Sequence, residues 1–488
     1  MHSSHPGSGP RSHPGRFHHA HAPVLAALMA LMLAACSDQP PTGPPGAPHP
    51  KLNVVVLGYT DLGTLGGDPS QAIGVNALGQ VVGSSIVTGT DAHAFLWTSA
   101  GGMRDLGTLG GDRSFAAGVN ALGHVVGSSD VTPNLAAQHA FLWQNGAMLD
   151  LGTLGGTSSE AAGVNAFGQV VGRSFMTTGA AHAFLWRDGA MHDLGTLGGP
   201  FSDAAGVNDL GQVVGSSYVN FNDQHAFLWQ NGAMRDLGTL GGNNSSAAGI
   251  NALGQVVGGS TTDGILATHA FLWQNDGHGM QDLGSLGSNR AVATGINDLG
   301  QVVGASGFAG TNAVNRAFLW QDGTMEDLGT LGGETSVAFA ISNDGQVVGE
   351  AALADGSHHA VLWTVALRAQ IDVAPGDPTN TIKLSRATVD VAVLGTPYFD
   401  ASRVSPATVT LGNEDGNDAS VQRNRRGVPQ AVFKDVDRDG DTDVLLTFDR
   451  SALVARGDLT LATTKLVLSG KLTTNKAIRG VNRVAVVR

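Results

Sequence analysis

The sequence predicts an all-β protein: a seven-bladed β-propeller followed by a small β-sandwich-like domain. Three observations predict the propeller. A motif related to DLGTLGG recurs seven times at spacings of 43 to 46 residues. Each repeat contains four short β-prone runs, and the two ends of the array complement one another. Four strands in a unit of this length are typical of a propeller blade.

The repeat is clearest at residues 225–260, HAFLWQNGAMRDLGTLGGNNSSAAGINALGQVVGGS. AAGIN and QVVGG are β-prone runs joined by a turn at Gly254, and Asn231-Gly232 is a strong hairpin signal after the apolar HAFLW run. No copy shows the 3.6-residue apolar rhythm of a helical solenoid. A β-solenoid remains as an alternative, although it usually repeats at shorter periods. The copies of the motif begin at Asp61, Asp105, Asp150, Asp193, Asp236, Asp282 and Asp327.

The ends of the array predict how the ring closes. Residues 52–67 resemble the last strand of a blade, with no blade before them. Residues 359–363 are a third-strand run after which the DLGTLGG motif is missing. Pairing the two would complete a seventh blade and remove an exposed sheet edge. We therefore assign residues 52–368 to the propeller.

The N-terminal segment, residues 1–35, predicts a lipoprotein signal peptide. Its apolar run at 23–35 is too short to span a bilayer and has the length of a signal-peptide hydrophobic region. The run ends in Leu33-Ala34-Ala35-Cys36, which resembles the bacterial lipobox. The resemblance implies acylation of Cys36, the only cysteine, and a membrane anchor. An ordinary secretory peptide is the alternative. Residues 36–51 are predicted to be a proline-rich tether.

The composition agrees with an exported protein. Forty acidic and 27 basic residues give a net charge of −13, which argues against nucleic-acid binding. A single cysteine excludes a disulfide framework, so burial of the core must provide the stability. We expect a monomer attached to the membrane through its lipid anchor, at the outer membrane or the cell surface. Its expected partner is an extracellular glycan, a peptide or a cell-wall component.

The array resembles the HAF-type extracellular repeat family of bacteria, named after the His-Ala-Phe found here at 93–95, 139–141, 182–184, 225–227 and 269–271. The resemblance covers residues 54–363. Two copies depart from it, because Arg316 replaces the histidine and Val361 replaces the phenylalanine. The resemblance implies an exported protein and brings no catalytic residues to carry over.

A histidine recurs at one position of the third strand in six copies. One histidine per blade cannot converge on a single ion at the roughly 2 Å that zinc–imidazole bonds require. We expect each histidine, together with the aspartate and the Ser or Thr of its blade, to satisfy buried polar groups between strands, as in Trp-Asp repeat propellers. The DLG aspartates are likewise expected to be scaffold residues. The histidines are His93, His139, His182, His225, His269 and His359.

The segments between VVG and HAF vary from 9 to 11 residues and in sequence, whereas the six residues between GG and the next GVN position are constant in number. Variable loops on a rigid scaffold usually contain the ligand-binding residues. The alternative is that these segments are solvent-exposed loops whose length and sequence vary without a function. Aromatic residues in the variable segments are the predicted ligand contacts: Phe175, Tyr218, Phe221 and Phe308.

The sequence thus predicts a surface-anchored binding, adhesion or scaffold lipoprotein without catalytic activity. The alternative is a propeller-based extracellular hydrolase or lyase that acts on polysaccharide, because propellers host such enzymes too. The polar departures from the repeat, His124, Glu350 and Arg316, form no coherent acid–base or nucleophile set.

Residues 369–488 lack the repeat and are predicted to form the β-sandwich-like domain. Residues 371–412 resemble the opening of a domain common at the C-termini of secreted bacterial proteins. Alternating β-branched residues at 388–393 and 465–470 independently favour strands.

An acidic stretch in this domain, AVFKDVDRDGDTDVLLTF at 431–448, predicts a structural calcium site. Alternating aspartates with Gly440 at a sharp turn follow the D-x-D-x-D-G pattern of calcium loops. The glutamate that ends an EF-hand loop is missing, since Leu446 stands there, and the flanks are predicted strands. A solvated acidic turn is the alternative. The candidate ligands are Asp435, Asp437, Asp439, Asp441 and Asp443.

Overall fold

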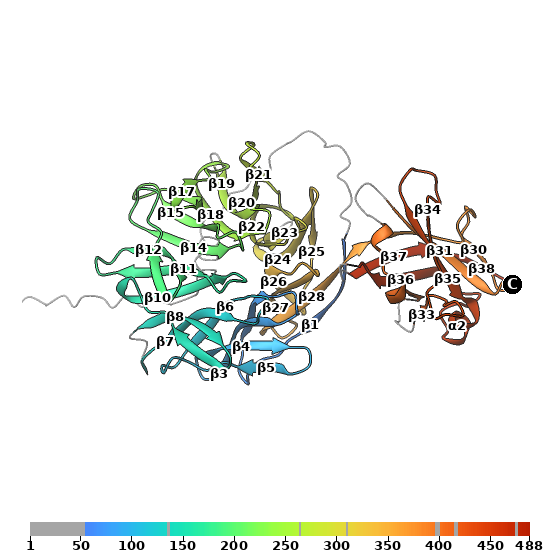
Figure 1. Ribbon diagram of the computed structural model, residues 1–488, viewed down its shortest axis with the longest axis horizontal. Helices are drawn as coiled ribbons and strands as arrows, with labels where there is room; N and C mark the ends of the chain where they lie inside the picture. Colours follow the sequence, from blue (N-terminus) through green and yellow to red (C-terminus); the bar gives the residue numbers. More distant parts are fainter. Residues whose placement is uncertain are drawn as a thin grey trace, which may run out of the picture. The chain divides into compact units, whose positions relative to one another are not determined.

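The structure is a computed structural model. It describes residues 54–133, 137–262, 265–308, 311–395, 401–413, 418–473 and 477–488 (Figure 1). Strands dominate these residues, and the all-β prediction is confirmed. The predicted signal peptide, the tether and Cys36 lie outside the described residues.

Six complete blades follow one another in the chain. In each blade the GVN strand pairs with the VVG strand, the VVG strand with the HAF strand, and the HAF strand with the strand before DLG, all antiparallel. The blades are β2(Ser70–Val75), β3(Val81–Thr88), β4(Asp91–Thr98) and β5(Gly102–Asp105); β6(Ser114–Val119), β7(Val125–Asp130), β8(Gln138–Gln144) and β9(Ala147–Asp150); β10(Gly155–Val164), β11(Val170–Met176), β12(Ala181–Arg187) and β13(Ala190–Asp193); β14(Ser202–Val207), β15(Val213–Tyr218), β16(Gln224–Gln230) and β17(Ala233–Asp236); β18(Gly241–Ile250), β19(Val256–Thr262), β20(Ile265–Trp273) and β21(Met280–Asp282); β22(Gly287–Ile296), β23(Val302–Phe308), β24(Thr311–Gln321) and β25(Thr324–Asp327).

The last blade takes its fourth strand from the other end of the array. It comprises β26(Gly332–Ile341), β27(Gln346–Leu353) and β28(His358–Arg368), and β1(Val54–Asp61) pairs with β28. Leu62, directly after β1, and Phe95 of the first blade pack in one core cluster with Val348 and Leu362 of the last. The described residues therefore contain seven four-stranded units joined end to end, by the strand pairing that the sequence predicted.

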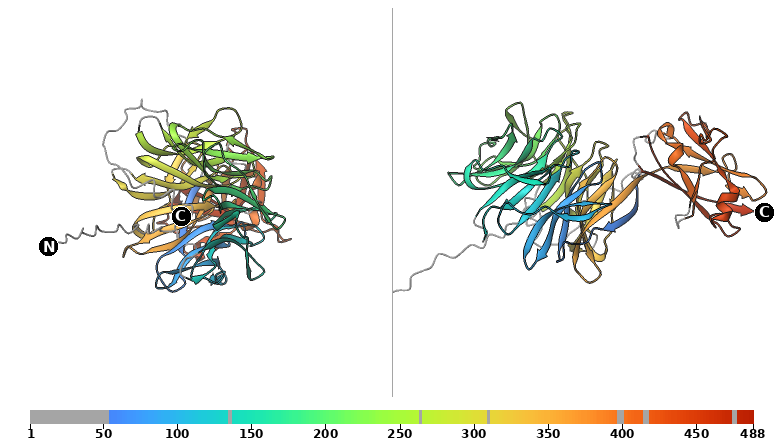
Figure 2. Two further views of the ribbon diagram at one scale, coloured as in Figure 1. Left: turned by 90° about the vertical axis from the view of Figure 1, so that its left-hand side faces the viewer. Right: turned by 60° about the horizontal axis from the view of Figure 1, so that its bottom comes forward.

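The GVN strands form the inner ring, where an asparagine ladder joins the blades. Asn76 Nδ2 donates to the carbonyl oxygen of Asn120 at 2.9 Å, and the equivalent bond recurs at five further junctions at 2.9 to 3.1 Å. The last blade has Ser342 at the asparagine position. Figures 1 and 2 show the blades side by side around this ring.

The glycine of each VVG motif is required by a close approach between the first two strands of the blade. The GVN strand has a register shift opposite this glycine. A Cβ atom on the glycine would lie 1.9 to 2.0 Å from a carbonyl oxygen of the GVN strand, which no side chain tolerates. The glycines are Gly83, Gly127, Gly172, Gly215, Gly258, Gly304 and Gly349.

Each blade has two ends. At one end lie the turns between the first and second strands, such as residues 76–80, and we call this end of the ring the tip face. At the other end lie the turns between the second and third strands together with the DLGTLGG connections, and we call it the loop face. The variable segments are shorter turns than their sequences predicted, because the strand ladder continues into them: β15 runs to Tyr218 and β16 begins at Gln224.

Residues after the propeller form two further sheets around one core. One sheet has the order β29(Gln370–Val373), β31(Thr388–Leu394), β35(Asp443–Asp449) and β34(Ala431–Lys434). The other runs from β37(Ala477–Arg483) through β36(Lys465–Lys471) and β32(Thr410–Gly412) to β33(Ala419–Ser420), and β37 also pairs with β28. Val391, Phe448 and Leu468 belong to the shared core. Smaller elements are β30(Thr381–Lys383), β38(Ala485–Val487), η2(Ala401–Arg403), η3(Pro406–Thr408) and α2(Arg450–Ala455).

The helix α2 is a local element that the sequence analysis did not predict. Asp449 ends β35 and caps the helix, because its carboxylate accepts hydrogen bonds from the backbone N–H groups of Ser451 and Ala452.

Candidate functional site

The repeated histidines and aspartates form one pair in each blade. In six blades the histidine Nδ1 lies 2.6 to 2.9 Å from an oxygen of the DLG aspartate. The aspartate Oδ1 also accepts the backbone N–H two residues later, as Asp105 does from Gly107 at 2.7 Å. In the last blade the aspartate is Asp61 of β1. The pairs therefore hold the third strand to the connection, as expected of scaffold residues.

Two serines fix the DLGTLGG connection in five of the seven copies, whereas Ala291 and Ala351 each replace one serine in the other two. Ser114 Oγ donates to the carbonyl oxygen of Gly107 at 2.6 Å and accepts the N–H of Ala94 at 2.9 Å. Ser129 Oγ accepts the N–H of Leu109 at 2.8 Å. Because backbone groups in these connections have side-chain hydrogen-bond partners, the connections at the loop face are held in one conformation.

The His269–Asp282 pair makes the stability of its blade depend on pH. The hydrogen bond with Asp282 raises the pKa of His269 above its usual 6.5, against the opposing effect of burial. A histidine with a raised folded-state pKa contributes stability below its unfolded pKa and loses that stability as the pH rises through its folded pKa. We therefore expect His269→Gln to lower the melting temperature more near pH 6 than near pH 9.

A natural control for this prediction exists in the next blade. Arg316 occupies the histidine position there, with its Nη1 3.6 Å from Asp327 Oδ2. An arginine stays charged across this pH range, so Arg316→Gln should lower the melting temperature by a similar amount at both pH values. A His269→Gln effect that does not change between the two pH values would contradict the linkage.

The structure separates the four predicted ligand-contact aromatics. Phe221 is 85% exposed in the turn between β15 and β16, and Phe308 is 37% exposed beneath the guanidinium of Arg316, whose Cζ lies 5.3 Å from the ring centroid. Phe175 lies half-buried in β11. Tyr218 packs edge-on against Phe201, with ring centroids 5.7 Å apart. Phe201 and Tyr218 thus form a ring pair, and Phe221 lies three residues after Tyr218 in the sequence.

The turn that carries Phe221 is held by its own side chains. Asn220 Oδ1 accepts the N–H groups of Asn222 and Asp223 at 2.7 and 2.9 Å, and Asn220 Nδ2 donates to Asp223 Oδ2 at 2.8 Å. The backbone N–H of Val219 donates to the carbonyl oxygen of Asp223. Phe221 is therefore displayed on a fixed turn.

A charged cluster links the third and fourth blades and was missed by the sequence analysis. Arg173 Nη2 lies 3.0 Å from Glu160 Oε1, and Arg173 Nη1 lies 3.7 Å from Asp203 Oδ2. Burial raises the pKa of Asp203 to about 6, against the opposing charge of Arg173. Among the described residues, the buried Asp203 Oδ1 and Arg173 Nε have no hydrogen-bond partner. The signal was available in the sequence, since Arg173 stands where the other copies have Ser, Gly, Ala or Glu.

The three polar departures from the repeat do not form one site. Glu350 binds Gln71 of the first blade and His358 of its own blade, with 2.7 Å between Glu350 Oε1 and His358 Nδ1. His124 lies beside Asn120 in the second blade, and Arg316 pairs with Asp327 in the sixth. Each therefore has a local partner in a different part of the ring.

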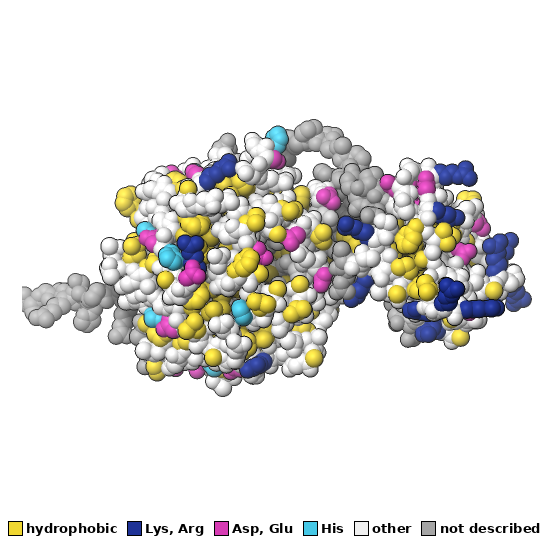
Figure 3. Space-filling model, in the orientation of Figure 1, with side chains coloured by type: hydrophobic (Ala, Val, Ile, Leu, Met, Phe, Trp, Pro, Cys, Tyr) yellow, Lys and Arg dark blue, Asp and Glu magenta, His cyan; other side chains and the backbone are white. Residues whose placement is uncertain are grey.

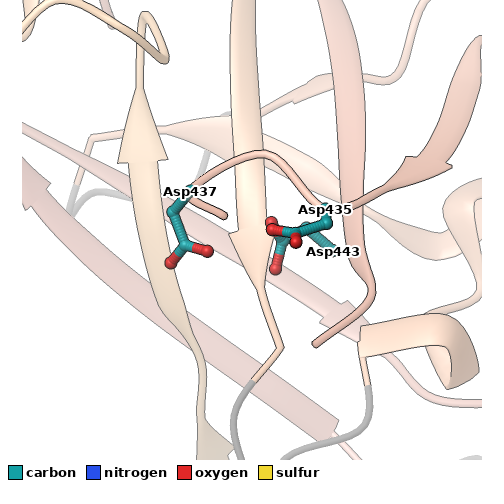
Figure 4. A group of neighbouring side chains, drawn as sticks. All are labelled: Asp435, Asp437 and Asp443. Carbon is teal, nitrogen blue, oxygen red and sulfur yellow. The ribbon is translucent and has the colours of Figure 1, made fainter. Parts of the chain in front are cut away.

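The acidic loop between β34 and β35 brings together three of its five aspartates. Carboxylate oxygens of Asp435, Asp437 and Asp443 lie within 4.8 Å of one another (Figure 4). Asp443 is fully buried and accepts the N–H groups of Gly395 and Val436 at 2.7 and 2.6 Å. Asp439 and Asp441 lie on the exposed turn outside this group. The flanking strands agree with the predicted strand–loop–strand arrangement.

A further carboxylate, Asp372 of β29, lies within electrostatic reach of the loop. Burial raises the pKa of Asp372, and the negative charges of Asp377 and Asp437 raise it further. Burial likewise raises the pKa of Asp437, with the charges of Asp439 and Asp443 adding to the effect. Mutual repulsion of this kind is what a bound cation relieves.

Comparisons with known proteins yield only distant structural similarity. No family model and no curated protein matches the chain, so the resemblance to HAF repeats stays a prediction. TolB from Acinetobacter baumannii aligns over 54% of this chain and 63% of its own length, at 13% identity and a TM-score of 0.35. The tricorn protease aligns over 83% of this chain and 46% of its own length, at 10% identity and a TM-score of 0.36. Similarities this low do not bear on function.

The helices of the described residues are short. None of the helices there is long and apolar enough to cross a bilayer.

Proposed function

We propose that this chain is an exported binding or scaffold protein, held at a membrane by lipid on Cys36, whose ligand contacts the loop face of the propeller. The single observation that carries the binding role is Phe221, an aromatic side chain 85% exposed on a turn fixed by Asn220. A large exposed aromatic that is already ordered loses little conformational freedom on binding. Such residues commonly serve as anchors in recognition.

The surroundings of Phe221 favour a glycan, a peptide or a cell-wall component. Phe201 is 41% exposed and packs against Tyr218, so apolar faces stand beside the amide and carboxylate groups of the same turn. Aromatic faces next to hydrogen-bonding groups suit sugar rings and peptide side chains. The net charge of −13 opposes a polyanionic ligand.

Phe221→Ala should weaken binding to the cognate glycan, wall fragment or peptide at least about tenfold, the size of effect expected for an anchor residue. The full chain, assayed with glycan arrays, wall fragments and intact cells, identifies the ligand, and titration measures the loss. Tyr59→Ala is the matched control, because Tyr59 is a 56% exposed aromatic of β1 outside the loop-face turns. Equal affinity of both variants and the parent protein would exclude Phe221 as the anchor.

The proposed calcium site uses Asp435, Asp437 and Asp443, with Asp372 nearby. Calcium binds hard oxygen ligands in flexible geometries, and three converging carboxylates supply several of the six to eight oxygens it needs. Backbone carbonyl groups and water would complete the shell. Because Asp443 is buried and bonded to backbone at Gly395, the ion would tie the loop to the core of its domain.

Calcium should raise the melting temperature of the C-terminal strands, by mass action on the folded state alone. At a free concentration one hundred times Kd the gain is about 2.7 kcal/mol. Asp437→Asn should abolish the rise, and Asp441→Asn, outside the group, should leave most of it. Calorimetry in calcium and in chelator measures both. Identical parent curves in the two buffers would refute the site.

A polysaccharide hydrolase or lyase remains the second candidate, and one observation favours it. Asp203, with a pKa of about 6, stands with the carboxylate of Glu160 around Arg173. A protonated and an ionised carboxyl group are the pair that glycosidases use. The burial of Asp203 Oδ1 opposes this role, since a general acid must reach the substrate. Polysaccharide turnover that is lost in Asp203→Asn would establish the enzyme.

A further inference from the structure

The tip face carries six exposed hydrophobic side chains, one at the turn between the first and second strands of each of six blades. They are 51 to 76% exposed, although turns of this kind usually carry polar residues. The seventh blade has Asp344 at this position. We call the set the apolar tip ring: Leu78, Leu122, Phe167, Leu210, Leu253 and Leu299.

Hydrogen bonds hold each member of the apolar tip ring in place. Asn76 Oδ1 accepts the N–H groups of Leu78 and Gln80, both at 3.0 Å, while Asn76 Nδ2 bonds the next blade. The same turn recurs in the other five blades of the ring. The apolar side chains therefore project from fixed turns that are joined around the axis, and they cannot fold back to bury themselves.

The chain enters the propeller on the same face. Val54, at the start of β1, pairs with Leu367 near the end of β28. This end of β28 lies at the tip face, because the N–H of Val365 donates to the carbonyl oxygen of Gly345 in the tip-face turn of the last blade. β1 then runs toward the loop face and ends at Asp61 opposite Val361. The 17 residues that separate Cys36 from Val54 reach about 50 Å at most in an extended proline-rich form. A lipid on Cys36 would therefore keep a bilayer within reach of the tip face.

Charge on the tip face selects the type of lipid. The turns between the first and second strands contain no Lys or Arg, and three of them carry an aspartate. The turns between the third and fourth strands lie at the same end and add one basic residue, Arg187, and three aspartates, Asp188, Asp276 and Asp322. Residues 52–368 have 8 basic and 25 acidic side chains, against 16 and 14 in residues 369–488. Figure 3 shows Lys and Arg crowded over the C-terminal strands and sparse over the blades. A surface that is apolar at its tips and acidic around them suits neutral headgroups and is repelled by anionic ones.

We propose that the apolar tip ring is a membrane-contact surface, which inserts its side chains into the interface of a zwitterionic bilayer. The proposal rests on the anchor at Cys36 proposed above. Six separate projecting side chains suit a fluid apolar layer, whereas a protein partner would need a matching ring of sockets. The contact would hold the loop face outward, toward the ligand.

A single cysteine in the chain allows a direct test, since acylation of Cys36 would block its thiol. In the full chain, Phe167→Cys and Thr178→Cys each add one site for an environment-sensitive thiol dye. Thr178 is exposed in the turn at the opposite end of β11, roughly 20 Å from Phe167 along seven residues of strand. In phosphatidylcholine vesicles containing spin-labelled phosphatidylcholine, we expect dye at 167 to be quenched at least fivefold more than dye at 178.

Further arms make each outcome decisive. Leu78→Ser with Leu210→Ser should reduce quenching at 167 severalfold, and so should replacing half of the lipid by phosphatidylglycerol. Equal quenching at both sites would overturn the proposal. A blue shift of the dye at 167 that depends on protein concentration and not on lipid would also overturn it, and would show that a second copy of the chain covers the apolar tip ring. If dye labels Cys36 in the parent chain, the anchor has failed instead. Flotation of that unacylated chain with phosphatidylcholine vesicles then tests membrane contact by the apolar tip ring. Flotation of the parent chain that is lost in the double variant supports the contact, whereas a parent chain that does not float overturns it.

Discussion

Deletion of residues 54–61 is expected to open the propeller and drive the protein into aggregates. The deletion strips β28 of its partner along seven paired residues and removes Asp61, the partner of His359. An exposed edge strand of this length is a template for association. We expect a melting temperature at least about 10 °C lower and a large loss of monodisperse protein, measured by calorimetry and light scattering.

Two comparisons make this test specific. Deleting residues 37–50 shortens the chain ahead of β1 and should leave the melting temperature of the blades unchanged. A synthetic peptide of residues 52–63 should restore stability to the protein that lacks 54–61, because it can occupy the vacant edge of β28. Unaltered melting and a monodisperse product after deletion of 54–61 would show that β1 does not hold the ring closed.

Gly172→Ala should be the most damaging single-methyl addition in its blade. The new Cβ would lie 1.9 Å from the carbonyl oxygen of Glu160 and 2.8 Å from Ala161 Cα, both in the backbone of β10. Neither contact can be relieved by turning a side chain, so the first two strands must separate. We expect a loss of about 3 kcal/mol or more in the free energy of unfolding, at the upper end for overpacking.

Gly58→Ala is the matched control for that substitution. Gly58 also lies in a strand with a register shift, yet a Cβ there meets nothing within 4 Å. The control should change the free energy of unfolding by no more than about 0.5 kcal/mol, the range of ordinary surface changes. Denaturant titration of the two variants measures the difference. Similar values for both would mean that the first two strands separate at little cost.

The repeat allowed most of the propeller to be predicted, because a blade's strands follow from a local pattern read seven times. The closing pair of β1 and β28 was also predictable, since a spare strand at one end matched a missing one at the other. The lengths of the turns were not. Backbone pairing between the second and third strands continues beyond the repeated VVG and HAF motifs; for example, Tyr218 pairs with Gln224. This pairing depends little on which side chains are present.

The candidate sites were predicted less completely. The acidic loop was found from its spacing, but the sequence could not separate Asp443, buried against Gly395, from the exposed Asp439. Asp372 lies far away in sequence and meets the loop only through the fold. The cluster of Glu160, Arg173 and Asp203 spans two blades, so no single repeat contains it. The apolar tip ring had a visible signal that was not used, an apolar residue in the middle of each N-x-L/F-G turn.

The pairing of β1 with β28 also determines how the protein carries mechanical load. Val54, where the N-terminal side of the chain arrives, and Arg368, where the chain departs for the C-terminal strands, stand at the same end of that pair. Tension between an anchored N-terminus and a load on the C-terminal strands would thus pass through one blade and bypass the other six. It would peel β1 from β28 one hydrogen bond at a time rather than shear all of them together. The ring would yield at its seam under modest force, while each remaining blade stays unloaded.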